Sequence, residues 1–368
     1  MAARLKVLLI TPDFPPEKGG IQILMGRLVE FSPGLDVRVL TLGQEGAEEY
    51  DRAAGFEVRR VGGPRSERRL ATLGLNARAV AEARGFRPDV ILSGHVITSL
   101  GVVALRRLLR VPLVVYVHAD ELRMRGGVAT PAVRHADAIV AVSRYTRDLV
   151  VERGADPERV HVIPPGVDLP APPRPRPPGP PVLLTVASLL FRYKGHDVMT
   201  RAMPLIRARV PEARWVVTGD GPFREVLENA VDAYGLGEAI DVRGRVSDAE
   251  RDELLETSTA FCMPSRIPAD GFGGEGFGIA YMEAAAHWMP TIGGNVAGAL
   301  DAVIDGVTGL LVDPTDHLAL AAAATELLAD PERAAEMGAA GRAHAERHAW
   351  PLIAGRLEEL LREVADKD

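Results

Sequence analysis

The sequence is poor in the residues on which several protein classes depend. It has one cysteine, Cys262, so it cannot form an internal disulfide, and a reducing compartment fits this usage. Aromatic residues make up only 5% of the chain, and no apolar run approaches the ~18 residues that a membrane-spanning helix needs. The start, MAARLKVLLITPDFPP, leads from a short apolar stretch into a proline-rich loop, which predicts a buried strand rather than a signal peptide. We therefore expect a cytoplasmic globular protein.

Motifs for metal binding and for nucleophilic catalysis are missing as well. There is no HExxH, no cluster of cysteine and histidine, no EF-hand loop and no GxSxG elbow. An Asp-x-Asp pair, which clamps the metal of many nucleotide-sugar enzymes, follows none of the predicted strands. We expect no metal site and no cofactor.

Charge is distributed unevenly along the chain. The net charge is −7, but residues 1–167 carry +5 and residues 168–368 carry −12. The basic half includes RRVGGPRSERR at 59–69, which is either a solvated loop or a contact for an anionic partner such as a membrane surface or a phosphorylated acceptor. Nucleic acid is not expected, because the chain is acidic overall and the run lacks interleaved aromatics.

Short apolar runs alternate with amphipathic helical stretches, which predicts an α/β fold with parallel sheets. In the first half the predicted strands are 6–10, 37–42, 89–94, 113–118, 138–143 and 160–164. The segment LPAPPRPRPPGPP at 169–181 cannot form a helix or a central strand, since each proline lacks a backbone donor, and it predicts an interdomain linker. The pattern then restarts, with predicted strands at 182–188, 214–221, 240–246, 260–265, 290–294 and 309–314.

Two such units predict a ligand cleft between two sheets, because ligands of open α/β sheets bind outside the carboxyl ends of the strands. Several candidate residues follow predicted strands: Gly19 and Gly20, His118, Arg192 and Lys194, and the TGDGP turn with Gly219. Arg192 and Lys194 could neutralise a pyrophosphate. Each of these also has a plain structural interpretation, as a turn, a backbone-bonded histidine or a solvated helix start.

The segment EGFGIAYME, at 275–283, has the strongest chemical signature. Glu275 and Glu283 can accept hydrogen bonds from several hydroxyls, and a Gly-Phe-Gly turn between them opens a predicted helix whose free amides can hold a phosphate. Glu283 stands among small apolar residues, which indicates a partly buried carboxylate with partners. Hydroxyls and phosphate together describe a nucleotide-sugar.

These motifs in this order resemble the retaining glycosyltransferases of family 4, which have the GT-B fold. The resemblance spans nearly the whole chain and is most specific at 260–314, where the PSR…GGEGFGI arrangement is similar to the phosphatidylinositol mannosyltransferase branch. It implies two Rossmann-like α/β/α domains facing each other across a cleft. Residues 1–168 would form the acceptor-binding domain and 182–350 the nucleotide-sugar domain. The helix at 351–368, near Trp350, would return to the first domain, although the pattern alone allows either domain.

The resemblance also assigns roles to individual residues. The catalytic group would be His118 at the donor sugar, Lys194 on the diphosphate and Glu275 on the sugar hydroxyls. Donor binding would involve the following residues: Gly20, Arg192, Gly219, Arg243, Gly276, Phe277, Gly278, Ile279 and Glu283. Two positions depart from the family pattern. Leu189 stands where an arginine usually precedes the lysine, so that Arg192 would have to supply the charge, and Leu300-Asp301 replaces a frequent Pro-Glu.

The expected reaction is metal-independent, retaining transfer of a hexose, with mannose as one candidate, from GDP-mannose or a UDP-sugar to an acceptor hydroxyl. The acceptor would be a glycan, a lipid or a small molecule, with contact at the inner membrane face through the basic half. Lys194, Arg192 and helix-start amides would stabilise the departing diphosphate. Two alternatives stay open: a UDP-sugar epimerase of the same fold, and a non-catalytic protein that binds a nucleotide-sugar.

Overall fold

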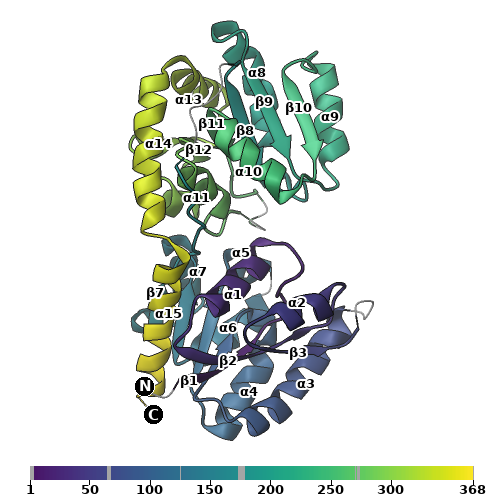
Figure 1. The fold of residues 1–368 in the computed structure, drawn as a ribbon, viewed down its shortest axis with the longest axis vertical. Helices are drawn as coiled ribbons and strands as arrows, with labels where there is room; N and C mark the ends of the chain where they lie inside the picture. The colour runs from purple at the N-terminus through teal and green to yellow at the C-terminus, as the bar shows by residue number, and fades with distance from the viewer. Residues whose placement is uncertain are drawn as a thin grey trace. The chain divides into compact units, whose positions relative to one another are not determined.

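The computed structural model describes residues 4–63, 68–124, 126–172, 179–269, 271 and 274–367. The chain divides into two compact units: unit 1 comprises Met1–Gly166 and Trp350–Asp368, and unit 2 comprises Val167–Ala349. Both are α/β, with helices on the faces of a parallel sheet (Figure 1). The prediction of two Rossmann-like domains is confirmed. Residues 173–178 of the predicted linker lie outside the described residues.

Unit 1 is built on a seven-stranded parallel sheet with the order β3-β2-β1-β4-β5-β6-β7. Its strands are β1 Leu5–Ile10, β2 Leu35–Leu42, β3 Glu57–Val61, β4 Val90–Ser93, β5 Leu113–Val117, β6 Ala138–Ala141 and β7 Val160–Val162. Its helices are α1 Gly20–Glu30, α2 Ala47–Ala53, α3 Arg68–Phe86, α4 Ser99–Leu109, α5 Ala119–Met124, α6 Gly126–His135, α7 Arg144–Glu152 and α15 Trp350–Ala365, with 3₁₀ turns η1 Val96–Thr98 and η2 Pro157–Arg159.

The strand order of unit 1 reverses between β1 and β4, so the ends of these strands form a topological switch point. The central strands β4, β5 and β6 are buried along their whole length, which explains their continuous apolar runs. Residues at the carboxyl ends of β1, β4 and β5 therefore meet at one edge of this sheet.

Unit 2 repeats this plan with a six-stranded parallel sheet in the order β10-β9-β8-β11-β12-β13. Its strands are β8 Val182–Val186, β9 Arg214–Thr218, β10 Ile240–Gly244, β11 Ala260–Met263, β12 Thr291–Gly294 and β13 Gly309–Val312. Its helices are α8 His196–Arg209, α9 Arg224–Ala233, α10 Asp248–Thr257, α11 Ile279–Ala286, α12 Ala299–Ala302, α13 His317–Ala329 and α14 Pro331–Glu346, with the 3₁₀ turn η3 Arg192–Lys194.

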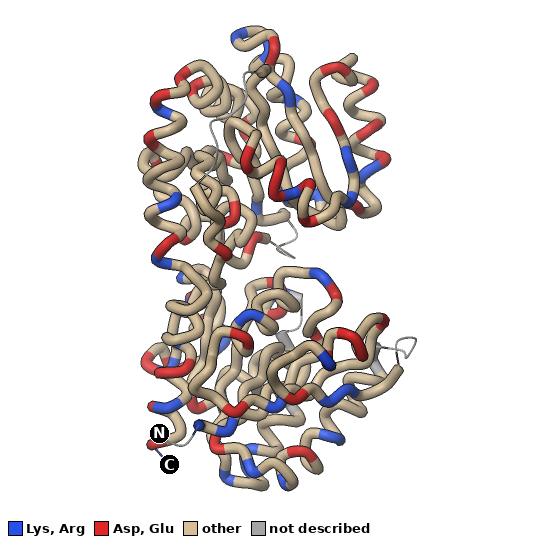
Figure 2. Tube along the Cα trace, viewed as in Figure 1, with Lys and Arg blue, Asp and Glu red and all other residues tan. Residues whose placement is uncertain are grey.

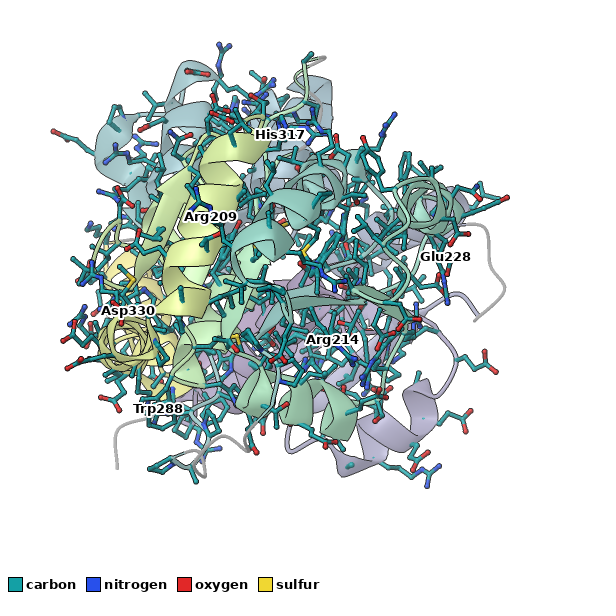
Figure 3. The ribbon with its side chains drawn as sticks, turned by 90° about the horizontal axis from the view of Figure 1, so that it is seen from above. Arg209, Arg214, Glu228, Trp288, His317 and Asp330 are labelled. Atoms are coloured by element: carbon teal, nitrogen blue, oxygen red, sulfur yellow. The ribbon has the colours of Figure 1, made fainter. Side chains whose placement is uncertain are left out.

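Short polar side chains fix where several helices of unit 2 begin. The Ser247 hydroxyl accepts a hydrogen bond from the Glu250 amide at the start of α10. Asp330, labelled in Figure 3, accepts one from the Arg333 amide at the start of α14, where Pro331 occupies the first helical position.

Acidic side chains are frequent along α9 and α10, as the red segments of Figure 2 show. These helices contribute much of the negative charge of the second half.

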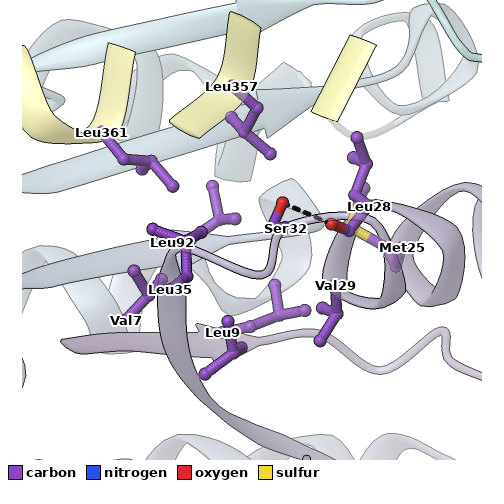
Figure 4. Close-up of a pocket in the computed structure, with 11 residues that line it drawn as sticks. Val7, Leu9, Met25, Leu28, Val29, Ser32, Leu35, Leu92, Leu357 and Leu361 are labelled. Carbon is purple, nitrogen blue, oxygen red and sulfur yellow. Dashed lines mark hydrogen bonds between the residues drawn. The ribbon is translucent and has the colours of Figure 1, made fainter. Parts of the chain in front are cut away.

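The C-terminal helix α15 packs in unit 1, against α1 (Figure 1). The Arg362 guanidinium donates to the Gly34 carbonyl oxygen at 2.8 Å, and Leu357 and Leu361 are buried. A small apolar cavity of about 10 Å³ remains between this helix, α1 and the sheet (Figure 4). Its size is that of about one water molecule, so it is a packing gap.

The interpretation of 59–69 as a loop is wrong at its start. Arg59 and Arg60 lie in β3, which pairs with β2. Arg60 forms an ion pair with Asp51 at 2.8 Å and donates to the carbonyl oxygens of Leu42 and Pro15. Residues 64–67 lie outside the described residues.

Among all the residues that the structure describes, no helix is both long and apolar enough to cross a membrane.

Candidate active site

A lysine and a glutamate form an ion pair at the carboxyl edge of the unit 2 sheet. Lys194 ends the turn η3 after β8, and its Nζ donates to Glu275 Oε2 at 2.5 Å. Both side chains are largely buried, with 13% and 15% of their surface exposed. A ligand could separate this pair. The ammonium of Lys194 can bind an anion, and the carboxylate of Glu275 can accept a hydrogen bond from a hydroxyl.

A second ion pair explains how two segments so far apart in the sequence meet. Arg266, in the segment after β11, forms two hydrogen bonds to the Asp197 carboxylate at 2.9 and 3.0 Å. Its amide also donates to the Tyr193 carbonyl oxygen at 2.8 Å. The fork geometry of a guanidinium on a carboxylate fixes orientation. It holds the segment leading to Glu275 against the start of α8, next to Lys194.

The Gly-Phe-Gly turn opens helix α11 through a left-handed residue. Gly278 precedes the helix with φ 97°, a conformation that favours glycine, and a Cβ there would lie 2.3 Å from the Tyr281 ring. Gly298 packs against the same turn, because a Cβ on it would lie 2.4 Å from Gly276 and Phe277 backbone atoms. Its amide donates to the Glu275 carbonyl oxygen at 2.9 Å. The Tyr281 amide donates to the Gly278 carbonyl oxygen at 3.0 Å, whereas the first amides of α11, including that of Ile279, have no acceptor one turn earlier in the helix and can bind an anion.

Helix α14 supports both ends of this segment. The His348 ring, just beyond α14, lies 5.9 Å from the Phe277 ring, centroid to centroid. Arg342 donates to the Ala286 carbonyl oxygen at the end of α11, and its guanidinium lies 4.1 Å from the centroid of the Trp288 ring (labelled in Figure 3). The turn that carries Glu275 and the helix α11 that follows it are therefore packed against α14 and the residues just beyond it.

Glu283, which lies in α11, has a partner that the sequence pattern did not identify. Arg251, from α10, lies 3.4 Å from its carboxylate. Burial raises the pKa of Glu283, and the Arg251 charge opposes that rise. A helix distant in the sequence thus supplies the cation that a partly buried carboxylate among alanines needs. Only the small apolar neighbours of Glu283 gave a sequence signal that such a partner exists.

The glycines of the TGDGP turn have a structural reason. Gly219 has φ 121°, and a Cβ on it would lie 1.9 Å from the Ala187 carbonyl oxygen. Its amide donates to the Gly244 carbonyl oxygen at 2.7 Å, at the end of β10. The turn is therefore packed tightly between the ends of β8 and β10. This contact accounts for the glycine without a ligand.

The remaining candidates of unit 2 lie around this edge. Arg243, in β10, pairs with Asp241 at 2.8 Å and with Glu250 at 3.2 Å. Arg192 is exposed, with its guanidinium 5.9 Å from the centroid of the Phe223 ring. Leu189 is only 1% exposed and belongs to the core, so a cation at this position would be buried rather than directed to the site. Both neighbours of Leu189, Ser188 and Leu190, are exposed.

Unit 1 contains the other two candidates, Gly20 and His118. Gly20 begins α1, and Gly19 precedes it in an extended conformation. His118 follows β5, is 9% exposed and stacks on Tyr116 with a centroid distance of 5.6 Å. Burial lowers the pKa of His118 to about 4, so its ring is neutral at pH 7. Since Nε2 lies 3.3 Å from the Gly94 carbonyl oxygen, that nitrogen carries the hydrogen, and Nδ1 can accept one from a hydroxyl.

The structure thus brings Lys194, Glu275 and the start of α11 together within unit 2. Glu283 lies farther along α11, while Gly219 lies in the turn after β9 and Arg243 lies in β10. In the part of the chain that the structure describes, no group of three or more acidic, histidine or cysteine side chains is arranged to hold a metal ion.

Comparison with protein families gives matches over both units. Residues 19–170 match the model of Glycosyltransferase Family 4, and residues 171–344 match that of glycosyl transferases group 1. The chain is 34% identical to a GDP-mannose-dependent alpha-(1-6)-phosphatidylinositol monomannoside mannosyltransferase of Mycolicibacterium smegmatis, over 96% of this chain and 98% of that protein. It is 30% identical to a GDP-mannose-dependent monoacylated alpha-(1-6)-phosphatidylinositol monomannoside mannosyltransferase of Corynebacterium glutamicum, over 98% and 99% of the two chains.

Solved structures share the fold at lower sequence identity. Sucrose-phosphate synthase from Thermosynechococcus elongatus superposes with a TM-score of 0.83 at 21% identity, over 99% of this chain and all of that one. Anabaena HepE in complex with UDP and glucose gives a TM-score of 0.79 at 19% identity, over 98% and 100% of the two chains.

Proposed function

Because this chain belongs to the family 4 glycosyltransferases and has their GT-B fold, we propose that it transfers mannose from GDP-mannose to a phosphatidylinositol mannoside. The observation that carries the choice of substrates is the similarity to two mannosyltransferases of that specificity over nearly the full length of both chains. The Lys194–Glu275 pair beside a helix start supports the donor site, since it offers groups for both a sugar and a diphosphate.

In the proposed donor complex the ion pair opens. Lys194 turns to the diphosphate, and Glu275 accepts hydrogen bonds from sugar hydroxyls. Glu283, with Arg251 at 3.4 Å, accepts hydrogen bonds from the ribose hydroxyls. The amides of Gly276, Phe277, Gly278 and Ile279 face the phosphates. The nucleotide half of the donor thus lies on unit 2.

The proposed reaction proceeds with retention at the anomeric carbon. The bond from C1 to the diphosphate oxygen breaks, the acceptor oxygen bonds to C1 on the same face, and the acceptor proton passes to the departing diphosphate. Negative charge grows on that diphosphate, where Lys194 and the start of α11 stabilise it. The neutral His118 accepts a hydrogen bond from the donor sugar through Nδ1. These fixed charges support a reaction that needs neither metal nor cofactor.

We also infer that unit 1 meets the membrane in which a phosphatidylinositol acceptor resides. Leu70 and Leu73 on α3 and Leu108 on α4 are more than half exposed, at 65%, 66% and 58%. Exposed arginines, Arg107 and Arg110, stand at the end of α4. Apolar side chains beside cations are suited to an anionic lipid surface at the inner membrane face.

A transfer assay tests the proposed activity. Wild-type protein is incubated in EDTA with GDP-mannose and phosphatidylinositol monomannoside, and the lipid product is measured by mass spectrometry. We expect transfer, and the Glu275→Gln variant should lose about 10²-fold or more in kcat/KM because a carboxylate that positions the sugar is gone. Glu336→Gln, an exposed carboxylate on α14, is the matched control.

Four results would each contradict a part of the proposal. No transfer by the wild type would reject the mannosyltransferase activity, and a requirement for added metal would reject the metal-independent reaction. Conversion of a UDP-sugar without any acceptor would instead indicate an epimerase. Wild-type turnover by Glu275→Gln would remove that residue from the site.

A further inference from the structure

The ion pair of unit 2 joins two groups that the proposed donor needs separately. Lys194 Nζ lies 2.5 Å from Glu275 Oε2, and the two side chains are 13% and 15% exposed. In the described part of the chain, neither side chain has a second ion-pair partner. A diphosphate therefore meets a lysine whose charge is already balanced, and a sugar meets a carboxylate that already has a partner.

The backbones that carry this pair are fixed, so the pair opens by rotation of its side chains. Gly195, next to Lys194, has φ 82°, and a Cβ on it would lie 2.3 Å from the Pro264 carbonyl oxygen. The Glu275 carbonyl oxygen accepts a hydrogen bond from the Gly298 amide at 2.9 Å. Because both side chains are long, their rotation is enough to give Lys194 a different anionic partner.

Breaking a largely buried ion pair is costly unless a ligand replaces both partners. When one partner is lost, the other charge stays without compensation in a poorly hydrated place. A nucleotide-sugar replaces both, because its diphosphate binds the ammonium of Lys194 and its sugar hydroxyls donate to the carboxylate of Glu275.

The free nucleotide replaces only one of the two partners. GDP carries the diphosphate but no sugar, so it would take Lys194 and leave the carboxylate of Glu275 without a hydrogen-bond donor. That carboxylate would also stand close to the negative phosphates, and like charges repel more strongly where water is scarce. The same ion pair thus opposes binding of GDP more than binding of GDP-mannose.

We propose that Glu275 competes with the diphosphate for Lys194, so that the site discriminates between the nucleotide-sugar and the nucleotide left after transfer. This role rests on the proposed mannosyl transfer and follows it in time: as GDP leaves, Glu275 returns to Lys194. Glu275 is then a specificity-determining residue in addition to a group that contacts the sugar.

Nucleotide binding by Glu275→Gln tests the competition. Glutamine has nearly the same size but no charge, so Lys194 has no carboxylate to leave when the diphosphate arrives. We expect the Kd for GDP to fall about fivefold, which corresponds to ~1 kcal/mol. The Kd for GDP-mannose should stay equal or rise, because the charged acceptor of the sugar hydroxyls is gone. Isothermal titration calorimetry without acceptor measures both constants, and Glu336→Gln on α14 is the control.

Thermal unfolding separates competition from plain repulsion between Glu275 and the diphosphate. In competition the free variant has lost the partner of Lys194, so its Tm should lie below that of the wild type, and saturating GDP should remove the difference. Tighter GDP binding with an unchanged Tm of the free variant would show repulsion instead and would overturn the competition. If Glu275→Gln does not fold, Glu275→Asp, with a shorter reach to Lys194, should bind GDP more tightly than wild type.

The Kd values themselves can also reject the competition. An unchanged or higher Kd for GDP in Glu275→Gln would do so, and so would an equal decrease for GDP and GDP-mannose, since a merely structural change acts on both ligands alike. Wild-type protein that binds GDP but transfers no mannose would contradict the proposed function and not the competition.

Discussion

At the residue scale, buried carboxylates show how strongly the surroundings of a side chain govern its chemistry. Glu275 is paired with a lysine, whereas Glu283 is partly buried among small side chains and has Arg251 at 3.4 Å. Burial raises the pKa of Glu283 because the charged form loses hydration, and Arg251 is the largest opposing influence. The two glutamates of one short segment therefore depend on different cations.

Removing the arginine should make nucleotide binding depend more strongly on pH. In Arg251→Gln the pKa of Glu283 rises further, so at pH 6 more of this carboxyl is protonated and one acceptor for ribose hydroxyls is lost. We expect the Kd for GDP at pH 6 to increase about threefold or more relative to wild type, with a smaller difference at pH 8. Isothermal titration calorimetry from pH 5.5 to 8 measures this, with Arg333→Gln on α14 as the control.

The stability of unit 2 should respond to pH in the opposite direction to GDP binding. A carboxyl whose folded pKa is raised binds its proton more tightly in the native state, so the free energy of unfolding rises as pH falls through that pKa. Acid would thus stabilise unit 2 at this position while it weakens GDP binding. Parallel pH profiles of Kd in wild type and Arg251→Gln would reject the role given to Arg251.

At the scale of elements, two short segments illustrate different limits of sequence patterns. The start of α11 was expected from EGFGI, and the structure shows why glycine is needed at Gly278, which is left-handed, and at Gly298, which packs against the backbone of Gly276. Position 189 shows the opposite case. The family usually has an arginine at the position of Leu189, so a cation was expected there. The structure places the Leu189 side chain in the core instead.

Helix α15 is an element whose contribution to stability can be measured. Leu361 is fully buried and lines the small cavity between α15, α1 and the sheet (Figure 4). Leu361→Ala should lower the free energy of unfolding of unit 1 by about 2–5 kcal/mol, since it enlarges that cavity. Urea unfolding followed by circular dichroism measures the loss.

The matched control lies on the same helix. Leu352 is 54% exposed, so Leu352→Ala should change stability by less than about 0.5 kcal/mol. GDP binding on unit 2 should persist at urea concentrations where unit 1 of Leu361→Ala has unfolded. Equal losses of stability in the two variants would contradict the packing of α15 in unit 1.

At the scale of the whole molecule, the two halves of the chain differ in charge, +5 for residues 1–167 and −12 for residues 168–368. The exposed leucines of α3 and α4 stand in the basic half, and the acidic helices α9 and α10 in the other (Figure 2). A negative lipid surface attracts the basic half of the chain and repels the acidic half. At 0.1 M salt these forces act over a distance of about 10 Å.

Vesicle sedimentation tests the membrane contact of unit 1. We expect the protein to sediment with phosphatidylinositol-containing vesicles at 50 mM NaCl, several-fold less at 500 mM, and little with phosphatidylcholine alone. Replacing Leu70 and Leu73 together by serine should weaken sedimentation, because their apolar area leaves water on binding. Leu318→Ser, at an equally exposed leucine of α13 in unit 2, should not. Equal sedimentation with both lipids would exclude an electrostatic contact.

The sequence by itself determined the α/β class, the two repeats of the strand pattern and the segments that carry Lys194, Glu275 and His118. These features are local: apolar runs, glycine turns and proline stretches act within a few residues. Even there β3 was missed, because its arginines suggested a loop. Family membership followed from motif order and is confirmed by the full-length relatives.

Only the tertiary structure decided which side chains meet. Arg251 and Glu283 are 32 residues apart in the chain, Lys194 and Glu275 are 81 apart, and Asp13, His95 and Glu121 come from three different strand ends. No sequence period records such pairs, because the crossovers of the two sheets, with orders 3-2-1-4 in unit 1 and 10-9-8-11 in unit 2, bring them together rather than neighbouring positions in the chain. The polar partners that set charge and direction in a buried site are therefore a property of the fold.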